Sequence, residues 1–351
     1  MSTSSVLSFA DAVDQFSSPR GYLAAATMGL PPRTTLEALR ADLERWDAAA
    51  CDPSGYDLTV ANTRAHYARL VGIDPSRVAI GSQTSAQAAV IAAAVPAGAE
   101  VLCVEGDFSS IVYPFLQRGD IRVRSVPLEA LADSIGDETW LVTFSLVQSS
   151  TGALADSPAI IEAAARHGAL TFCDLTQAAG VLPVDATRYD ITVCHAYKWL
   201  CAPRGVSFLT LLSETQEFVT ATQAGWYAGD DPWTSCYGPE IHLANDARRY
   251  DVSPAWQAWV GAEQSIGMFA GLDIPTVWEH AAGLGDQLSA ALDIPEFHKA
   301  IVTWDDPDGR ALARLAAAGI RASGRAGRVR VAFHLWNTEE DVRAVVDALA
   351  R

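Results

Sequence analysis

The sequence predicts an α/β fold, with a large domain built on a mostly parallel sheet and a smaller C-terminal α+β domain. Between Val78 and Leu212, short apolar runs alternate with longer Ala-rich stretches of helical character, which is typical of a parallel sheet covered by helices. The 351 residues are too many for one core of ordinary size and suit one large and one small domain. We expect residues 20–255 to form the large domain, and residues 1–19 and 256–351 the small one.

Six apolar runs are the candidate strands of the large sheet. In chain order they are Val78 to Ile80, Glu100 to Val104, Trp140 to Phe144, Ala169 to Cys173, Ile191 to Cys194 and Val206 to Leu211. Helical patterns lie between them, as at Ser85 to Ala94 and at Ala159 to His167, where Gly168 is a stop signal. Ligands of such sheets bind at the carboxyl ends of the strands, so the residues that follow these runs are the first candidates for chemistry.

The remaining third of the chain predicts one long loop and the smaller domain. Gly225 to Leu243 is rich in Gly, Trp, Tyr and Asp without clear periodicity, and is either a loop that lines a pocket or a packed surface loop. A helical stretch follows from about Pro254, and Gly327 to Phe333 has the pattern of a strand. The segment from Asn337 to Glu340 predicts the capped, acidic start of a last helix.

Composition excludes several classes of function. The chain has 42 acidic and 25 basic side chains, and its formal charge of −17 repels nucleic acid and anionic lipid surfaces. Its longest nearly unbroken apolar stretch, Ala88 to Ala99, is too short to span a membrane. Met1 to Ser5 do not begin an export signal, and the six cysteines show no metal-binding spacing. We therefore expect a cytoplasmic protein with free thiols, no metal, and no nucleic-acid or membrane partner.

Three features in order along the chain suit pyridoxal 5'-phosphate (PLP) chemistry. That chemistry needs a lysine amine for a Schiff base, a carboxylate opposite the pyridine nitrogen and a cradle for the phosphate. Ile80 to Ala86 is a strand-to-helix turn whose amides and hydroxyls would face an anion. Asp174 ends a candidate strand and is followed by Gln177. Lys198 lies between two apolar strands, where a merely solubilising lysine is unexpected.

These residues resemble those of the class V aminotransferase family of PLP fold type I, which includes cysteine desulfurases, kynureninases and isopenicillin N epimerases. The segments that carry the resemblance are Gly21 to Gly29, Asp174 with Gln177, Tyr197-Lys198-Trp199, Arg248 to Pro254 and Arg330 to Glu340. The resemblance implies that Asp174 pairs with the pyridine nitrogen and that Gln177 binds the ring hydroxyl. Phe108 stands where the family stacks an aromatic side chain on the cofactor, although it also suits a core position.

The same resemblance assigns the phosphate and the substrate. Gln83, Thr84 and His195 would hold the phosphate, and Ser253 resembles a hydroxyl that reaches it from the other subunit of a homodimer. Arg330 falls where the family binds the α-carboxylate of a small amino-acid substrate.

Two features of this part of the site stay open. Arg325 and Arg328 are alternatives to Arg330 as the carboxylate ligand. Ser149 occupies a position where many members carry an asparagine near the ring hydroxyl, so this contact of the cofactor differs from the family pattern.

The expected activity is that of an aminotransferase or a lyase acting on an α-amino acid. A carbon–sulfur β-lyase of a cysteine conjugate and an epimerase are alternatives, because these reactions share their first steps. A cysteine desulfurase is disfavoured, since the segment from Gly319 to Arg328 has no cysteine and Tyr197 replaces the histidine that desulfurases commonly place before the lysine. A nicotinamide oxidoreductase lacks its glycine-rich turn, and a catalytically silent scaffold is the remaining alternative.

Overall fold

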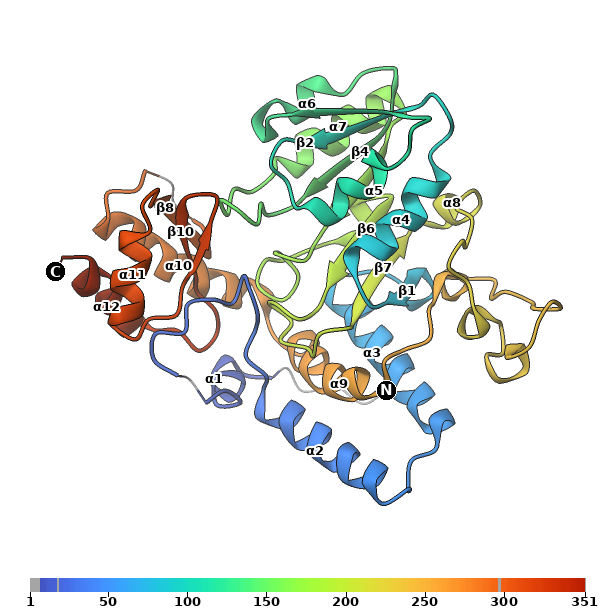
Figure 1. Cartoon of the computed structure of the whole chain (residues 1–351), viewed down its shortest axis with the longest axis horizontal. Helices are drawn as coiled ribbons and strands as arrows, with labels where there is room; N and C mark the ends of the chain where they lie inside the picture. Colours follow the sequence, from blue (N-terminus) through green and yellow to red (C-terminus); the bar gives the residue numbers. More distant parts are fainter. Residues whose placement is uncertain (1–6, 18, 296–297, 351) are drawn as a thin grey trace.

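The computed structural model describes residues 7–17, 19–295 and 298–350, which form a seven-stranded sheet and a separate three-stranded sheet. The segment from Met1 to Ser5 lies outside the described residues. Figure 1 shows the large sheet with helices on its faces, and the small sheet grouped with α10, α11 and α12 at the left. The mixed α/β fold that the sequence predicts is confirmed.

The large sheet has the strand order β1-β7-β6-β5-β4-β2-β3. Its strands are β1 (Val78–Gly81), β2 (Glu100–Val104), β3 (Arg122–Val126), β4 (Thr139–Ser145), β5 (Leu170–Asp174), β6 (Ile191–His195) and β7 (Ser207–Leu211). Only β7 runs against its neighbours, β1 and β6. All six predicted strands are present within one or two residues at each end, and β3 is an additional strand.

Helices pack on this sheet and around the small one. They are α1 (Phe9–Val13), α2 (Arg33–Asp47), α3 (Tyr56–Leu70), α4 (Thr84–Ala94), α5 (Tyr113–Leu116), α6 (Leu131–Ser134), α7 (Ser157–His167), α8 (Ser213–Gln216), α9 (Trp256–Ala270), α10 (Ile274–Ala291), α11 (Arg310–Ala317) and α12 (Glu339–Ala350). As predicted, α7 ends at Gly168, which has the left-handed conformation that glycine adopts readily. Thr338 caps α12, since its hydroxyl accepts from the Glu340 amide.

One edge of the large sheet collects the candidate residues. Strands β4, β5 and β6 are parallel neighbours and end at Ser145, Asp174 and His195. Strand β1 ends at the same edge, because Ser207, the first residue of the reversed strand β7, pairs with both Gly81 and His195. The turn after β1 and the ends of β4 to β6 therefore meet in space, as expected for the ligand-binding edge of such a sheet.

The small sheet holds the end of the chain against its beginning. It has the order β8-β10-β9, with β8 (Ile301–Asp305), β9 (Ser323–Arg325) and β10 (Arg328–Ala332) all antiparallel. Bridges from Tyr22 to Arg321 and from Ala24 to Ala332 attach the N-terminal segment to it. Helix α9 packs on α2 and α3, and the predicted domain boundaries at residues 20 and 256 stay predictions.

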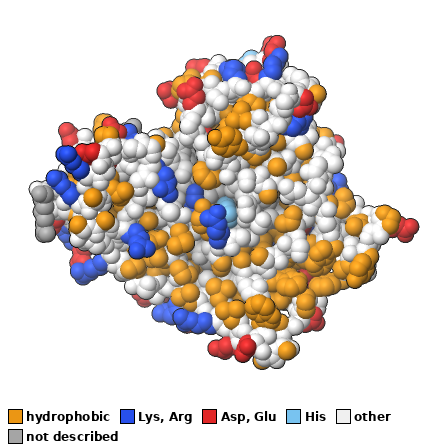
Figure 2. Space-filling model, in the orientation of Figure 1, with side chains coloured by type: hydrophobic (Ala, Val, Ile, Leu, Met, Phe, Trp, Pro, Cys, Tyr) orange, Lys and Arg blue, Asp and Glu red, His pale blue; other side chains and the backbone are white. Residues whose placement is uncertain are grey.

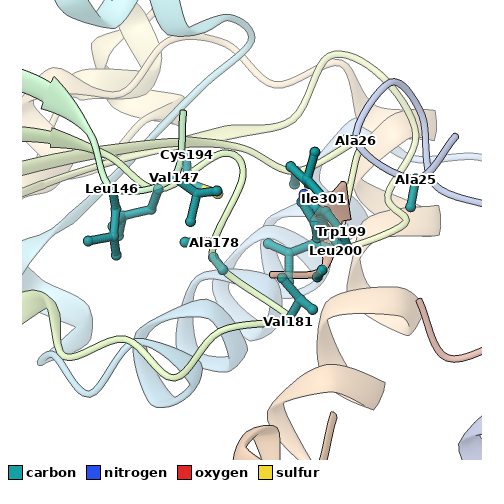
Figure 3. Packing of buried hydrophobic residues seen from close by; sticks show 14 of the residues in the cluster. Ala25, Ala26, Leu146, Val147, Ala178, Val181, Cys194, Trp199, Leu200 and Ile301 are labelled. Atoms are coloured by element: carbon teal, nitrogen blue, oxygen red, sulfur yellow. The ribbon is translucent and has the colours of Figure 1, made fainter. Parts of the chain in front are cut away.

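The core continues across the junction of the two sheets. Figure 3 shows Trp199 and Leu200, which follow the candidate lysine, grouped with Ile301 of β8 near Ala26. Leu146, Val147 and Cys194 form the part of the same cluster that lies at the large sheet. Packing of this kind fixes the lysine turn relative to the small sheet, because a close-packed interior leaves little room for one part to move without the other.

Candidate active site

Lys198 lies in the turn after β6 and is only 5% exposed. Its Nζ atom lies 5.2 Å from the centre of the Phe108 ring and 5.8 Å from that of Tyr197. Burial lowers the pKa of its amine to about 8, with Asp174 opposing this shift and Arg330 and Arg325 adding to it. A buried amine with a lowered pKa is available in its neutral, nucleophilic form near neutral pH.

The N-terminal segment presses closely on this lysine turn. The Gly29 amide donates to the Tyr197 carbonyl at 2.9 Å, and a methyl group at Gly29 would collide with the Lys198 carbonyl oxygen. The close approach explains why a glycine stands at position 29.

Asp174 is the buried carboxylate at the end of β5. Burial raises its pKa to about 6, while hydrogen bonds from Thr176 and the charge of Lys198 lower it. One carboxylate oxygen accepts from the Thr176 amide at 2.8 Å. The chemistry of this group suits a partner that carries a proton on a ring nitrogen, since such a partner offsets the cost of burying the charge.

Several buried polar atoms without a hydrogen-bond partner in the described chain gather where β1, β7 and β6 meet. They are His195 Nε2, Ser207 Oγ and both side-chain polar atoms of Gln87. A Cβ placed on Gly81 would fill the space beside Gln87 and Ser207. Such orphaned atoms call for an external partner, and burial lowers the pKa of His195 to about 4, so its ring is neutral.

The predicted phosphate residues Gln83 and Thr84 lie at this same junction. Gln83 caps α4 without a side-chain hydrogen bond to the helix, and Thr84 is the buried first residue of that helix. The free amides of a helix start suit an anion. Ser253 lines a cavity of about 370 Å³ together with Gly81 and Ser82 of its own chain, and its role across a subunit boundary stays a prediction.

Gln177 and Ser149 join the end of β5 to the arginine of the small sheet. Gln177 Nε2 donates to the Ala26 carbonyl at 3.0 Å and to Ser149 Oγ at 2.9 Å. Arg330 Nη1 also donates to Ser149 Oγ, at 3.0 Å, and to the Ser149 carbonyl. The structure thus brings together three residues that lie far apart in the sequence.

The three candidate arginines differ in their surroundings. Arg330 is 1% exposed, has no acidic partner in the described chain and donates from Nη2 to Thr27 Oγ1 at 2.8 Å. Burial and the neighbouring Arg325 lower its pKa to about 10. Arg325 is exposed and reaches the same Thr27 oxygen at 3.5 Å, whereas Arg328 pairs with Asp305 at 2.6 Å.

A cavity of about 620 Å³ lies beside Lys198. Lys198, Phe108, Ser149, Arg330 and Arg325 line it, and Arg328 does not. Its remaining wall is mostly apolar and comes from the N-terminal segment, α2 and the stretch after Lys198, including Met28, Leu30, Pro31, Leu36, Leu39 and Pro203. Figure 2 shows several basic side chains near the middle of the face that it draws, and basic and acidic ones toward the margins. The cavity suits an anionic ligand with an apolar part.

Sequence reasoning missed several residues of this site. Thr27 and Cys201 line the cavity, and Arg204 lies 4.9 Å from the Tyr197 ring. Asp107 accepts from the Phe108 amide and from Ser145, and so holds the turn that carries Phe108. Asp107 directly precedes Phe108 in the sequence, but only its hydrogen bonds to Ser145 of β4 show that it holds the turn of Phe108 in place.

The long segment from Gly225 to Leu243 is a packed surface loop in the described chain. Tyr227 and Trp233 both donate to the carboxylate of Asp57 on α3, at 3.0 Å and 2.6 Å. None of its residues lines the 620 Å³ cavity. Tyr227 and Trp233 face α3 whereas Tyr237 is 91% exposed, and the alternative that this segment lines a pocket stays a prediction.

Solved structures of high similarity identify the class of fold. A complex of the cystine C–S lyase C-DES with cysteine persulfide has a TM-score of 0.84 at 20% identity and covers 94% of this chain and 97% of that one. The cysteine desulfurase CsdA of Escherichia coli has a TM-score of 0.84 at 18% identity, covering 99% and 98%. The chain therefore has the fold of PLP-dependent enzymes of fold type I.

Sequence relatives identify the family. The sequence profile of the class-V aminotransferases matches residues 22–323. An uncharacterized aminotransferase of Bacillus subtilis, YcbU, is 25% identical over 82% of both chains, and the isopenicillin N epimerase of Streptomyces clavuligerus is 24% identical over 82% of both. A kynureninase of Deinococcus radiodurans is 28% identical over 63% of this chain and 56% of its own. This chain belongs to the class-V aminotransferase family.

The residues present fit the cofactor of that family, pyridoxal 5'-phosphate. The unpaired polar atoms beside the start of α4 suit its phosphate, Asp174 suits its ring nitrogen, and the buried amine of Lys198, with its lowered pKa, suits its aldehyde. Among the described residues, no group of three or more histidine, cysteine or acidic side chains is placed to hold a metal ion. No helix among them is long and apolar enough to cross a bilayer.

Proposed function

We propose that this protein is a PLP-dependent enzyme that acts on an α-amino acid as an aminotransferase or a lyase and carries its cofactor on Lys198. The observation that carries this proposal is the buried amine of Lys198, whose pKa is lowered to about 8, in one cavity with Arg330, a buried guanidinium without an acidic partner in the described chain. A lysine and an arginine without an acidic partner in one cavity suit the amine and the carboxylate of an amino acid.

Each side chain has a defined task in this proposal. Arg330 binds the substrate carboxylate, and Asp174 holds a proton at the ring nitrogen. When bound, the cofactor supplies an electron sink for the electrons released at Cα. Lys198 would move the proton at Cα, and the apolar wall would keep water away from that atom.

The proposal excludes a cysteine desulfurase, and three facts about the described cysteines support this. The segment 319–328 has none, and Cys236 is exposed on the packed loop rather than at the cavity. Cys201 lines the cavity, but burial raises the pKa of its thiol well above the ordinary value. A thiol held in its protonated form is a poor nucleophile.

The absorption spectrum of the cofactor-loaded protein tests this function. We expect a visible band that borohydride removes, pyridoxyl on Lys198 in a peptide map, and a keto acid or an elimination product from at least one amino acid. Lys198→Ala should retain the fold and lose all turnover. A wild-type protein that binds the cofactor but converts no amino acid would favour the scaffold alternative.

We also propose a homodimer. The exposed large apolar side chains of α2, of the start of α3 and of the packed loop support it, since soluble monomers rarely expose so many together. They are Leu43 (49%), Trp46 (61%), Leu58 (69%), Trp233 (41%) and Tyr237 (91%). Figure 2 shows hydrophobic side chains spread along the lower right of the molecule toward the projecting loop.

A further inference from the structure

Trp199, the residue after Lys198, makes a hydrogen bond that the proposed chemistry does not yet use. Its side chain is 1% exposed, and its indole Nε1 donates to Gln177 Oε1 at 2.7 Å. Its backbone carbonyl accepts from His334 Nε2 at 2.8 Å, and the two rings lie 5.2 Å apart. Trp199 is therefore held at both its backbone and its side chain.

The indole of Trp199 and the carbonyl of Ala26 together fix which way the Gln177 amide points. An indole N–H can only donate, so the atom of Gln177 that faces it must be the oxygen. The amide nitrogen then faces the other way, and its two hydrogens go to the Ala26 carbonyl and to Ser149 Oγ. With the amide reversed, Trp199 and the amide nitrogen would both be buried donors facing each other.

This orientation decides what Ser149 can offer to a ligand. Its hydroxyl accepts from two obligate donors, Gln177 Nε2 at 2.9 Å and Arg330 Nη1 at 3.0 Å. A hydroxyl has two acceptor sites and one proton to donate, so both acceptor sites are occupied and the proton is left. Ser149 lines the cavity that contains Lys198.

We propose that Trp199 is a positioning residue that, through Gln177, keeps Ser149 a hydrogen-bond donor toward an anionic oxygen of the bound cofactor. The inference rests on the proposed cofactor site at Lys198. It also explains how a serine can serve at a position where the family resemblance suggests an asparagine, because two fixed donors direct the serine proton to the ligand. In a Trp199→Phe variant only the Ala26 carbonyl still favours this orientation, so the reversed amide, whose oxygen would take the Ser149 proton, gains population.

The chain offers a matched control for the loss of an indole. Trp259 on α9 is 0% exposed and packs on Phe208 at 5.6 Å, but its indole nitrogen has no hydrogen-bond partner in the described chain. Trp199→Phe and Trp259→Phe remove the same atoms from a buried position, and only the first removes a hydrogen bond. Any difference between them in cofactor binding therefore reports on the bond to Gln177.

The experiment measures the dissociation constant of pyridoxal 5'-phosphate from the full-length protein by equilibrium dialysis. We expect Trp199→Phe to bind about tenfold more weakly than Trp259→Phe, the effect of one hydrogen bond to a charged group. Equal binding by these two variants would overturn the proposal. The measurement needs no turnover, so a protein without amino-acid activity would contradict the proposed function while leaving this result readable.

A double-mutant cycle separates positioning from a general loss of packing. Ser149→Ala removes the proposed donor and should also weaken cofactor binding about tenfold. If Trp199 acts through Ser149, adding Trp199→Phe to Ser149→Ala should weaken cofactor binding by less than about twofold further. The Ser149 hydroxyl through which Trp199 acts is already absent from the single variant. Additive losses would show that Trp199 supports the fold alone and would overturn the proposal.

Discussion

Lys198 and Asp174 are ionisable groups at the same sheet edge, and burial moves their pKa values toward each other. The pKa of Lys198 falls to about 8 and that of Asp174 rises to about 6. Each shift disfavours the charged form, as expected where water is excluded. The amine is thereby made reactive near neutral pH, and the carboxylate is left in need of a partner that carries a proton.

The lowered pKa of Lys198 predicts how cofactor capture depends on pH. Capture requires the neutral amine, which gains population as pH rises through its pKa, so the rate of cofactor binding to the unloaded protein should rise to a plateau with a midpoint near pH 8. Arg330→Gln removes a positive neighbour and should move this midpoint upward. Stopped-flow absorbance measures the rate, and a midpoint near 10.5 would contradict the assignment.

Arg330 and Arg328 allow a matched test of the carboxylate site, because they lie two residues apart on β10 and only Arg330 lines the cavity. For Arg330→Gln we expect kcat/KM for the amino acid to fall about a hundredfold, through a raised KM, and to change little for the corresponding amide. Steady-state kinetics on both substrates measures this. Arg328→Gln, which loses only the exposed pair with Asp305, should leave both values within about twofold. Equal losses for the acid and the amide in Arg330→Gln would instead favour Arg325 as the ligand.

At the scale of elements, β3 is the one strand of the large sheet that the sequence analysis did not predict. It lies at one edge of the large sheet, β1 forming the other edge, and Arg122 and Arg124 on it pair with Glu138 and Glu100. An edge strand buries little surface and is commonly protected by charge, so it lacks the apolar run that reveals an interior strand. The interior strands β4 to β7 were predictable because nearly all of their residues are buried.

The turns at the sheet edge are connected by side chains rather than by strand pairing. Asp107, after β2, accepts from the Ser145 amide and hydroxyl and from Gln148 Nε2, which lie at and after the end of β4. These bonds hold Phe108 over the cavity, where it lies 5.2 Å from Lys198 Nζ. Such contacts join segments about 40 residues apart and leave no periodic signal in the sequence.

Large apolar side chains are exposed on α2, at the start of α3 and on the packed loop. If it is a homodimer through α2 and the packed loop, the wild-type protein should have twice the 37.4 kDa mass of one chain. Replacing Trp46 and Tyr237 by glutamate should shift it toward the monomer, because charges placed in an apolar interface stay unpaired. Light scattering coupled to size exclusion measures the mass. Leu116→Glu on α5, another exposed apolar position (49%), is the control, and a monomeric wild type would contradict the dimer.

The sequence by itself determined the α/β class, the interior strands, the order of the phosphate turn, the acid and the lysine, and membership of a PLP-dependent family. These features are local, since strand burial, turn chemistry and short motifs are written in neighbouring residues. Only the tertiary structure decided that Arg330 rather than Arg328 lines the cavity, and that Gln177, Ser149 and Trp199 form one network with it. Those contacts depend on how the small sheet packs against the lysine turn, and packing between residues more than 100 positions apart has no local signature.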